Sequence, residues 1–173
     1  DSTTIEQEGV LIDNFLLVDQ GRFETEALEA LLASGRWPVR NARQNVADLQ
    51  AQIAACTRGA NELLAMIEHF GLETVLAYTR HVQDNAEESV RRVITRLTDG
   101  EFEYTLDNGA VIRVKVSVDH GQREATIDFT GTSTQLPNNF NAPSAVCVAA
   151  VLYVFRTLVD DAIPLNAGCL KPL

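Results

Sequence analysis

A strict seven-residue repeat of apolar side chains is the feature of this sequence that most constrains its fold. Between residues 46 and 67 the apolar positions lie alternately three and four residues apart, and they are Val46, Leu49, Ile53, Cys56, Ala60, Leu63 and Ile67. This spacing places them on one stripe of an α-helix. We expect Asn45 to cap the start of this helix and the negative charge of Asp48 to stabilise the positive end of the helix dipole. We expect Gly71 to end the helix.

A second helical pattern follows directly, with apolar positions from Leu72 to Leu97. Two long helices joined at Phe70 and Gly71 predict an antiparallel helical hairpin over residues 43–97. Residues of opposite charge stand four apart on the second helix, and we interpret them as ion pairs of a solvated face. They are Glu87 with Arg91 and Glu88 with Arg92.

The period changes from helical to alternating in residues 98–131. Apolar and polar residues alternate in three runs, around Phe102–Leu106, Val111–Val118 and Ala125–Phe129. Asn108-Gly109 separates the first two runs and is a strong β-hairpin signal. The pattern predicts a three-stranded antiparallel meander with one buried face, which needs a helix or another sheet to cover it.

The last segment, residues 132–173, begins as a polar loop and continues as a helix that is apolar nearly all round. Pro143 suits the first turn of that helix, which we expect to end near Val159. A helix of this composition is buried on most sides. We expect it to need neighbours that this chain lacks, and so to leave hydrophobic surface exposed.

Residues 1–42 are acidic and irregular, with one short helix predicted from Thr25 to Ala33. Together the four segments predict an α+β fold: a long antiparallel αα-hairpin, then a three-stranded antiparallel meander and a buried apolar helix. We treat residues 1–173 as a single section of a larger subunit, because the chain begins without Met and stops without a polar tail.

Composition excludes several classes of protein. The formal net charge of −10 argues against a general nucleic-acid binder, because phosphate neutralisation needs a basic surface. No apolar run approaches the roughly 18–20 residues of a membrane span. Three widely spaced cysteines, Cys56, Cys147 and Cys169, form no disulfide framework, which favours a cytoplasmic location. We interpret all three as structural rather than nucleophilic, Cys56 as a small buried hydrophobe.

No local motif for catalysis or metal binding is present in the sequence. The histidines show neither HxxxH nor HExxH spacing, and there is no Walker loop, GxGxxG or GxSxG. We therefore expect no metal or cofactor to be bound by this chain itself.

Several stretches, taken together and in this order, resemble the hydantoinase B/oxoprolinase family over almost the whole chain. They are Asp48–Ala55, Phe70–Val75, Asp128–Ser133 with Gln135, Asn141–Pro143 and Ile163–Leu170. The family includes ATP-dependent 5-oxoprolinases, B subunits of N-methylhydantoinases and related subunits of ketone carboxylases and lactamases. Its subunits are much longer than 173 residues, so the resemblance implies an internal section.

The resemblance also implies cofactors and partners for the whole enzyme. An ATP-binding A-type subunit or fused domain, with ATP and Mg, phosphorylates the oxygen of a small cyclic amide, and the B-type part handles the activated intermediate. A divalent metal site built from His and Asp residues lies upstream of the matching section. We expect an oligomer without nucleic-acid or membrane partners, and an isolated chain with neither ATPase nor amidase activity.

The candidate substrate-binding residues fall into three groups, and no catalytic residue is assigned. The loop of Thr130, Gly131 and Thr132 can present hydroxyl and N–H groups to an anion, or it can simply satisfy its own backbone. Asp128 beside it is either a general base or an exposed strand residue.

The other two groups are side-chain amides and a helix face. Asn141 and Asn166, with Asn139, can bind amide or carbonyl groups, and helix capping or turn formation explains them equally. Asp48 and Gln52 lie four apart on one helix face, either for a polar contact or as a capping carboxylate and an exposed amide.

Two functions from different classes remain open for this chain. In the first it belongs to an ATP-dependent cyclic-amide hydrolase and contributes substrate contacts. In the second it is a scaffold and assembly module whose hairpin packs against another subunit. A related ATP-dependent ketone carboxylase is a third interpretation.

Overall fold

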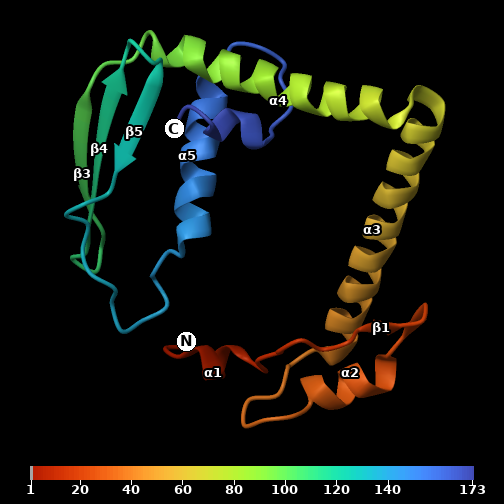
Figure 1. The fold of residues 1–173 in the computed structure, drawn as a ribbon. Helices are drawn as coiled ribbons and strands as arrows, with labels where there is room; N and C mark the ends of the chain where they lie inside the picture. Colours follow the sequence, from red (N-terminus) through yellow and green to blue (C-terminus); the bar gives the residue numbers. More distant parts are fainter. Residues whose placement is uncertain (1) are drawn as a thin grey trace. The chain divides into compact units, whose positions relative to one another are not determined.

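The computed structural model describes residues 2–173 and divides into two compact units (Figure 1). The first contains the described residues up to His69 together with Leu136–Phe140, and the second contains Phe70–Gln135 and Asn141–Leu173. Each unit has its own cluster of buried hydrophobic side chains.

The first unit has a small core around the predicted short helix. Its elements are α1 (Ile5–Glu8), β1 (Val18–Asp19), β2 (Arg22–Phe23), α2 (Thr25–Leu32) and α3 (Ala42–Phe70). Leu28 and Leu32 of α2 and Val46 of α3 are buried together, and six partly buried apolar residues pack around them. The helix predicted from Thr25 is confirmed, because its i and i+4 leucines face this cluster.

Helix α3 starts earlier than the sequence suggested. It begins at Ala42, and the Oδ1 of Asn41 accepts a hydrogen bond from the N–H of Gln44 at 3.2 Å, which is the geometry of an N-cap. The prediction that Asn45 caps the helix is therefore wrong. Its end is as predicted: α3 stops at Phe70, and Gly71 has a φ of +83°, which glycine adopts without steric cost.

The second unit contains the elements that follow Gly71. They are α4 (Leu72–Ile94), β3 (Gly100–Thr105), β4 (Val111–Asp119), β5 (Glu124–Asp128), α5 (Ser144–Leu158) and the 3₁₀-helix η1 (Ala167–Leu170). The strands form one antiparallel sheet in the order β3-β4-β5, which confirms the predicted meander.

The sheet is amphipathic, as its alternating sequence requires. Phe102 pairs with Val114, and Val116 pairs with Ile127, so these apolar side chains share one face. On the other face Arg113 forms an ion pair with Glu103 across the β3–β4 ladder. One sheet face is therefore available to pack against the helices.

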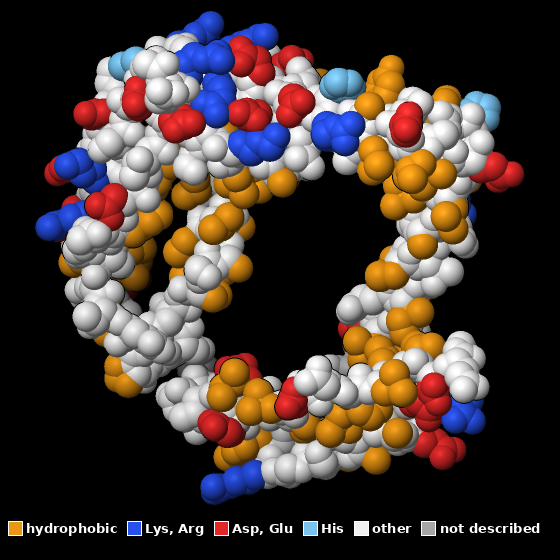
Figure 2. Space-filling view, in the orientation of Figure 1, with side chains coloured by type: hydrophobic (Ala, Val, Ile, Leu, Met, Phe, Trp, Pro, Cys, Tyr) orange, Lys and Arg blue, Asp and Glu red, His pale blue; other side chains and the backbone are white. Residues whose placement is uncertain are grey.

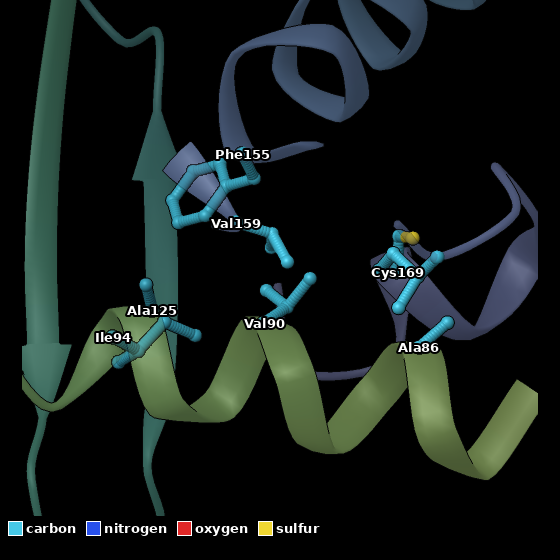
Figure 3. Close-up of a cluster of buried hydrophobic side chains, with 8 residues drawn as sticks. Ala86, Val90, Ile94, Ala125, Phe155, Val159 and Cys169 are labelled. Carbon is cyan, nitrogen blue, oxygen red and sulfur yellow. The ribbon is translucent and has the colours of Figure 1, made fainter. Parts of the chain in front are cut away.

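The main core joins four elements of the second unit (Figure 3). Helix α4 supplies residues one turn apart, and these meet side chains of β5, of α5 and its following loop, and of η1. The buried members are Ala86, Val90, Ile94, Ala125, Phe155, Val159, Ile163 and Cys169. The helices thus cover the end of the sheet near Val116 and Val118, which pack against this cluster.

The C-terminal segment packs closely against α4. A Cβ at Gly168 would lie 2.1 Å from the backbone oxygen of Gln83, so only glycine fits there. Beyond it, the N–H of Ala125 donates to the carbonyl of Pro172 at 2.9 Å. The backbone of the segment is thus fixed to both α4 and the start of β5.

Three predictions of burial were wrong. The meander was expected to have one buried face, but its apolar side chains on β3 are exposed, Phe102 at 64% and Tyr104 at 56%. Cys56 is exposed on α3, although its stripe suggested a buried position. In α5 Phe155 is buried, but Val146, Val148, Tyr153, Val154 and Leu158 are exposed, so most of this helix is uncovered. The exposed hydrophobic surface expected for α5 is confirmed. Cys147 is half-buried and Cys169 fully buried.

The α+β class is confirmed, with the two long helices, the meander and the apolar helix in the predicted order. None of the helices among residues 2–173 is long and apolar enough to cross a membrane.

Candidate functional site

The loop after β5 uses its polar groups to extend the sheet. The hydroxyl of Thr132 accepts from the N–H of Arg113 and donates to its carbonyl, both at 3.0 Å. Ser133 also bonds to both backbone groups of Val111. The Ser133 hydroxyl accepts from the N–H of Val111, and the backbone N–H of Ser133 donates to the carbonyl of Val111, both at 2.8 Å. These bonds continue the pairing of β4 beyond the end of β5.

Gly131 and Thr130 shape the turn that makes this possible. Gly131 has a φ of +92°, and a Cβ there would lie 3.2 Å from Cδ of Arg113. The N–H of Thr130 donates to Oδ1 of Asp128 at 2.8 Å. Hydrogen bonds from Thr130 hold the pKa of Asp128 below its ordinary value, so this carboxylate is a weaker base than an ordinary aspartate.

Asn166 caps the 3₁₀-helix η1. Its Oδ1 accepts from the N–H of Gly168 at 2.8 Å, and its Nδ2 donates to the carbonyls of Pro164 at 3.1 Å and Val82 at 3.5 Å. The side chain thereby fixes the segment that carries Gly168 against α4. Thr132 and Asn166 are held by different elements, β4 and α4.

The remaining predicted residues are exposed. Asn141 lies on the chain leading into α5. Asp48 and Gln52 lie on α3 in the first unit, and the carboxylate of Asp48 accepts a hydrogen bond from the side-chain amide of Gln44 at 2.7 Å.

A cavity in the first unit gathers polar groups that the sequence did not bring together. It has a volume of about 750 Å³, within the range of small-molecule sites. Four side-chain amides, a carboxylate, an arginine and a tryptophan are among its lining residues: Gln7, Asn41, Asn45, Asn139, Glu8, Arg40 and Trp37. Of these, Asn139 was named from the sequence as a possible amide-binding residue. Asn45 lines the cavity instead of capping α3.

A smaller cavity of about 160 Å³ lies in the second unit, between α4 and the end of α5. Its charged lining residues are Arg92, Arg96, Asp160 and Asp161.

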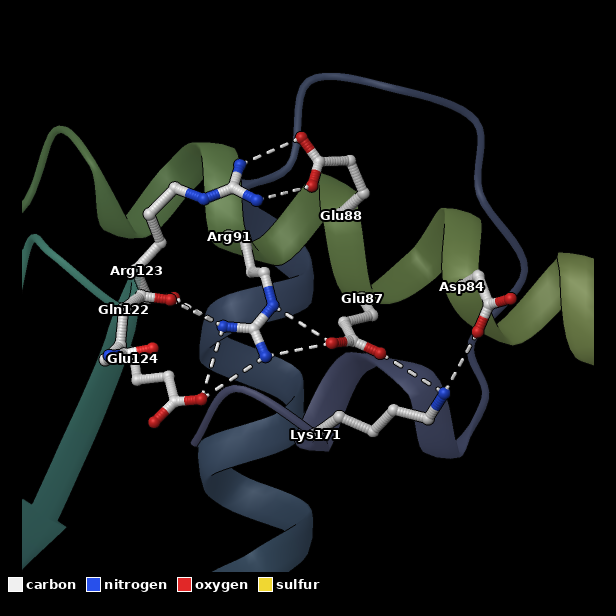
Figure 4. A network of polar contacts seen from close by, with 8 residues as sticks. All are labelled: Asp84, Glu87, Glu88, Arg91, Gln122, Arg123, Glu124 and Lys171. Carbon is white, nitrogen blue, oxygen red and sulfur yellow. Dashed lines mark hydrogen bonds and ion pairs between the residues drawn. The ribbon is translucent and has the colours of Figure 1, made fainter.

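Arg91 is the centre of a polar network that joins α4 to the β4–β5 turn and to η1 (Figure 4). Its guanidinium donates to Glu87 at 3.0 Å and to the carbonyls of Gln122 at 2.8 Å and Arg123 at 3.2 Å. Its side chain is only 16% exposed. The interpretation of Glu87 and Arg91 as a solvated face was therefore wrong, because the pair is shielded by the turn.

Two further ion pairs extend the network. Arg123 makes a two-pronged contact with the carboxylate of Glu88, both bonds at 3.0 Å. Lys171 lies 3.2 Å from both Asp84 and Glu87. Hydrogen bonds from Arg91 lower the pKa of Glu87, and those from Arg123 lower the pKa of Glu88. The network acts as a clamp between elements distant in sequence.

No group of three or more His, Cys, Asp and Glu side chains in residues 2–173 is arranged to hold a metal ion.

Comparison with known proteins identifies the family. The family model for hydantoinase B/oxoprolinase matches residues 1–173. The chain belongs to this family. The resemblance noted in the sequence is thereby confirmed.

Curated members of the hydantoinase B/oxoprolinase family align with nearly the whole chain. 5-Oxoprolinase 1 of Arabidopsis thaliana is 41% identical over 99% of the chain, and the 5-oxoprolinase of Saccharomyces cerevisiae is 35% identical over 99%. The chain spans only 16% and 14% of the lengths of these two proteins.

A solved structure in the same comparison has a similar fold. It is the ATP-dependent caprolactamase of Pseudomonas jessenii, with a TM-score of 0.71 and 22% sequence identity. The alignment covers 97% of this chain and 29% of that chain. At this identity the likeness establishes the fold alone.

Sequence reasoning missed the bonds of Arg91 to the β4–β5 turn and the grouping of the cavity residues for the same reason. They bring together positions far apart along the chain: Asn45 and Asn139 line one cavity, and Arg91 bonds to the carbonyl of Gln122. No local spacing signals such contacts. For Arg91 the sequence signal was its position on a helix face that also carries Asp84 and Glu88.

Proposed function

We propose that this chain is a section of the B-type component of an ATP-dependent cyclic-amide hydrolase. The observation that carries the proposal is the 41% identity with a 5-oxoprolinase over 99% of the chain, within a family match over its full length. The partner is an ATP-binding A-type subunit or fused domain. The working compartment is the cytoplasm, in keeping with three free cysteines.

The chemistry of such an enzyme explains why an ATP-using partner is needed. A five-membered cyclic amide resists hydrolysis at neutral pH, and phosphorylation of its oxygen creates a good leaving group and an electrophilic carbon. Water, activated by a general base or by a divalent metal bound elsewhere in the enzyme, then attacks that carbon. The ring C–N bond breaks as the nitrogen takes a proton, and hydrolysis of the acyl phosphate releases phosphate. The contribution of this chain is to bind and orient the ring.

The cavity of the first unit suits that contribution. A side-chain amide offers both a donor and an acceptor, so Asn45 and Asn139 can pair with the N–H and carbonyl of a ring amide. Arg40 can pair with a carboxylate or phosphate, and the indole of Trp37 offers an apolar wall. These groups can bind a small ring with one amide and one anionic group, with Arg40 offsetting the carboxylate of Glu8 that also lines the cavity.

Thr132 and Asn166 have a different role in this proposal. The hydrogen bonds of the Thr132 hydroxyl and of both ends of the Asn166 amide go to backbone groups. We assign them to positioning the fold, which supports a scaffold role for these parts of the second unit. Thr130, Gly131, Asn141, Asp48 and Gln52 stay candidates for substrate contact.

The test is an assay of the full-length enzyme that contains this section, with its ATP-binding partner and with 5-oxoproline, hydantoin or acetone. We expect ATP-dependent ring opening of a cyclic amide. Asn45→Ala and Asn139→Ala should raise KM about 10-fold or more without lowering the melting temperature, consistent with loss of one or two hydrogen bonds.

Thr132→Val and Asn166→Ala are the matched controls, and they should lower the melting temperature with a smaller change in KM. An unchanged KM in both cavity variants would show that the cyclic amide does not bind in this cavity. Turnover of acetone, with no turnover of either cyclic amide, would show that the enzyme is a ketone carboxylase and not a cyclic-amide hydrolase.

A further inference from the structure

The small cavity of the second unit is lined by charged side chains of both signs. It has a volume of about 160 Å³ and lies between α4 and the segment that ends α5. Arg92 on α4 and Arg96 in the turn after it line one side, and Asp160 and Asp161, just beyond α5, line the other. Figure 2 shows charged side chains along α4, whereas those of α5 are mostly hydrophobic.

The main core of the second unit holds the walls of this cavity in place. Val159 lines the cavity and is itself a buried member of that core, and Val93, another lining residue, packs against it. Ser89 also lines the cavity and is only 8% exposed. All the lining residues belong to the second unit, so the shape of the cavity is set within that unit.

The charged groups around the cavity do not neutralise one another. Within residues 2–173 no ion pair is formed by Arg96, Asp160 or Asp161. Arg92 pairs with Glu88, a residue of its own helix, at 3.3 Å. The side formed by α4 therefore keeps a positive charge, and the side formed by the end of α5 keeps a negative one.

This arrangement of charge selects a class of ligand. A simple anion is attracted by the two guanidinium groups and repelled by the two carboxylates, and a simple cation meets the reverse. A neutral molecule takes water from all four charges and returns no charge-assisted contact. A small molecule that carries both an ammonium and a carboxylate group is attracted by both sides.

We propose that this cavity binds the ammonium and carboxylate groups of a free amino acid. The carboxylate lies against Arg92 and Arg96, because a planar guanidinium group matches the two oxygens of a carboxylate. The ammonium group lies against Asp160 and Asp161, which follow the negative end of the dipole of α5.

The remaining lining groups suit the rest of such a molecule. The side chains of Val93 and Leu158 offer an apolar surface to its carbon atoms. The hydroxyl of Ser89 donates to the carbonyl of Asn85 at 2.8 Å, and its oxygen can accept a further hydrogen bond from the ammonium group. The cavity is smaller than the roughly 300–1,000 Å³ of sites for drug-sized ligands, which favours a small amino acid.

The ligand class has a chemical link to the proposed reaction. Opening a simple lactam leaves an amine and a carboxyl group on one molecule, so the product of such a reaction is an amino acid. That link rests on the proposed function, whereas the binding of an amino acid does not. The two cavities share no lining residue and belong to different units.

The first experiment titrates the chain with L-alanine and follows the backbone amide signals by NMR. Propionate and ethylammonium are the matched controls, because each keeps one charge of alanine and lacks the other. We expect alanine to shift the signals of Ser89, Val93 and Val159 until they saturate. Each control should bind at least about 10-fold more weakly, since it loses the charge-assisted contacts of one side.

The second experiment repeats the alanine titration on variants that remove one charge. Arg96→Gln and Asp161→Asn should each weaken binding at least about 10-fold. Arg80→Gln on α4 and Asp107→Asn in the β3–β4 turn lie outside the cavity and should leave binding unchanged. All four side chains are exposed, so circular dichroism should show the same helix content in each variant.

A double variant tests the division of roles between the two sides. Asp160→Asn with Asp161→Asn removes the negative side and keeps both arginines. This variant should bind propionate more tightly than the unaltered chain does, because the repulsion of its carboxylate is gone. Its binding of alanine should fall.

The outcomes decide the proposal. Signals that do not shift with alanine up to its solubility, or alanine binding that Arg96→Gln leaves intact, overturn this site. Propionate binding as tight as that of alanine by the unaltered chain would show an anion site and overturn the amino-acid class. Turnover is not measured, so a failure here is separate from a failure of the proposed hydrolase function.

Discussion

Helices α3 and α4 are both long and amphipathic, and they are stabilised in different ways. Helix α3 has 29 residues, of which Val46 is buried, whereas α4 has 23 residues and buries five, including Ala86, Val90 and Ile94. The polar contacts differ as well. The ion pair of Arg58 in α3 lies within the helix, whereas Arg91 of α4 reaches the β4–β5 turn.

The difference shows that an apolar stripe identifies a face without saying what covers it. The stripe of α4 meets a sheet, a helix and a 3₁₀-helix, so its stability is tied to the core of the second unit. Within the described residues of the first unit, the stripe of α3 is covered near its start, by the cluster around Leu28 and Leu32.

The largest contrast is expected from truncation of an apolar side chain. Ile94→Ala removes a fully buried side chain of α4 and should lower the free energy of unfolding by about 2–5 kcal/mol. Leu63→Ala on the exposed stripe of α3 should change it by less than about 0.5 kcal/mol. Urea titration followed by circular dichroism, at a concentration where the chain is monomeric, measures both. Equal costs would mean that the two stripes are equally covered.

Replacing one glycine in each region by alanine should change the free energy of unfolding in opposite directions. Gly168→Ala places a Cβ 2.1 Å from the backbone oxygen of Gln83, and relief of this overlap should cost about 1–3 kcal/mol. At Gly59 in α3 a Cβ meets open space, so Gly59→Ala should stabilise the helix by about 0.5–1 kcal/mol. Melting temperatures of the two variants should move in opposite directions. A stable Gly168→Ala variant would show that η1 does not need its close contact with α4.

Much of the fold could be predicted because its signals are local. The change from helical to alternating period near Asp99 located the meander, and Asn108-Gly109 fixed its first turn. Gly71 ended α3 where expected. The start of α3 was misplaced because Asn41 and Asn45 are equally good caps by residue type, and only the backbone geometry chooses between them.

The candidate site was less predictable, since its contacts connect distant parts of the chain. The bonds of Thr132 with Arg113 depend on the register of β4 and β5, which residue types near Thr132 do not reveal. The exposure of Cys56 depends on whether another surface covers the stripe of α3. The cavity at Asn45 and Asn139 requires two segments 94 positions apart to meet.

A third contrast lies between two arginines of α4. Arg91→Ala leaves the carbonyl of Gln122 and the carboxylate of Glu87 without this donor, which should cost about 1–3 kcal/mol. Arg92 is 74% exposed and pairs with Glu88 at 3.3 Å, so Arg92→Ala should cost less than about 1 kcal/mol. Hydrogen exchange at the β4–β5 turn should rise in the first variant alone. Similar exchange in both would contradict the clamp assigned to Arg91.

The smallest expected effect is the response of the clamp to acid. Arg91 lowers the pKa of Glu87 and Arg123 lowers that of Glu88, so both carboxylates are more acidic in the folded chain than in the unfolded chain. Such groups stabilise the fold above their unfolded pKa, near 4.5, and the stabilisation is lost as the pH falls through the lower folded values. The free energy of unfolding should therefore decrease between about pH 5 and pH 3. Glu87→Gln should be less stable than the unaltered chain at neutral pH and should lose less on acidification. A Glu87→Gln variant with an unchanged acid response would show that the ion pair of Glu87 with Arg91 contributes nothing to the pH dependence, and the contact of α4 with the sheet would then rest on its apolar packing.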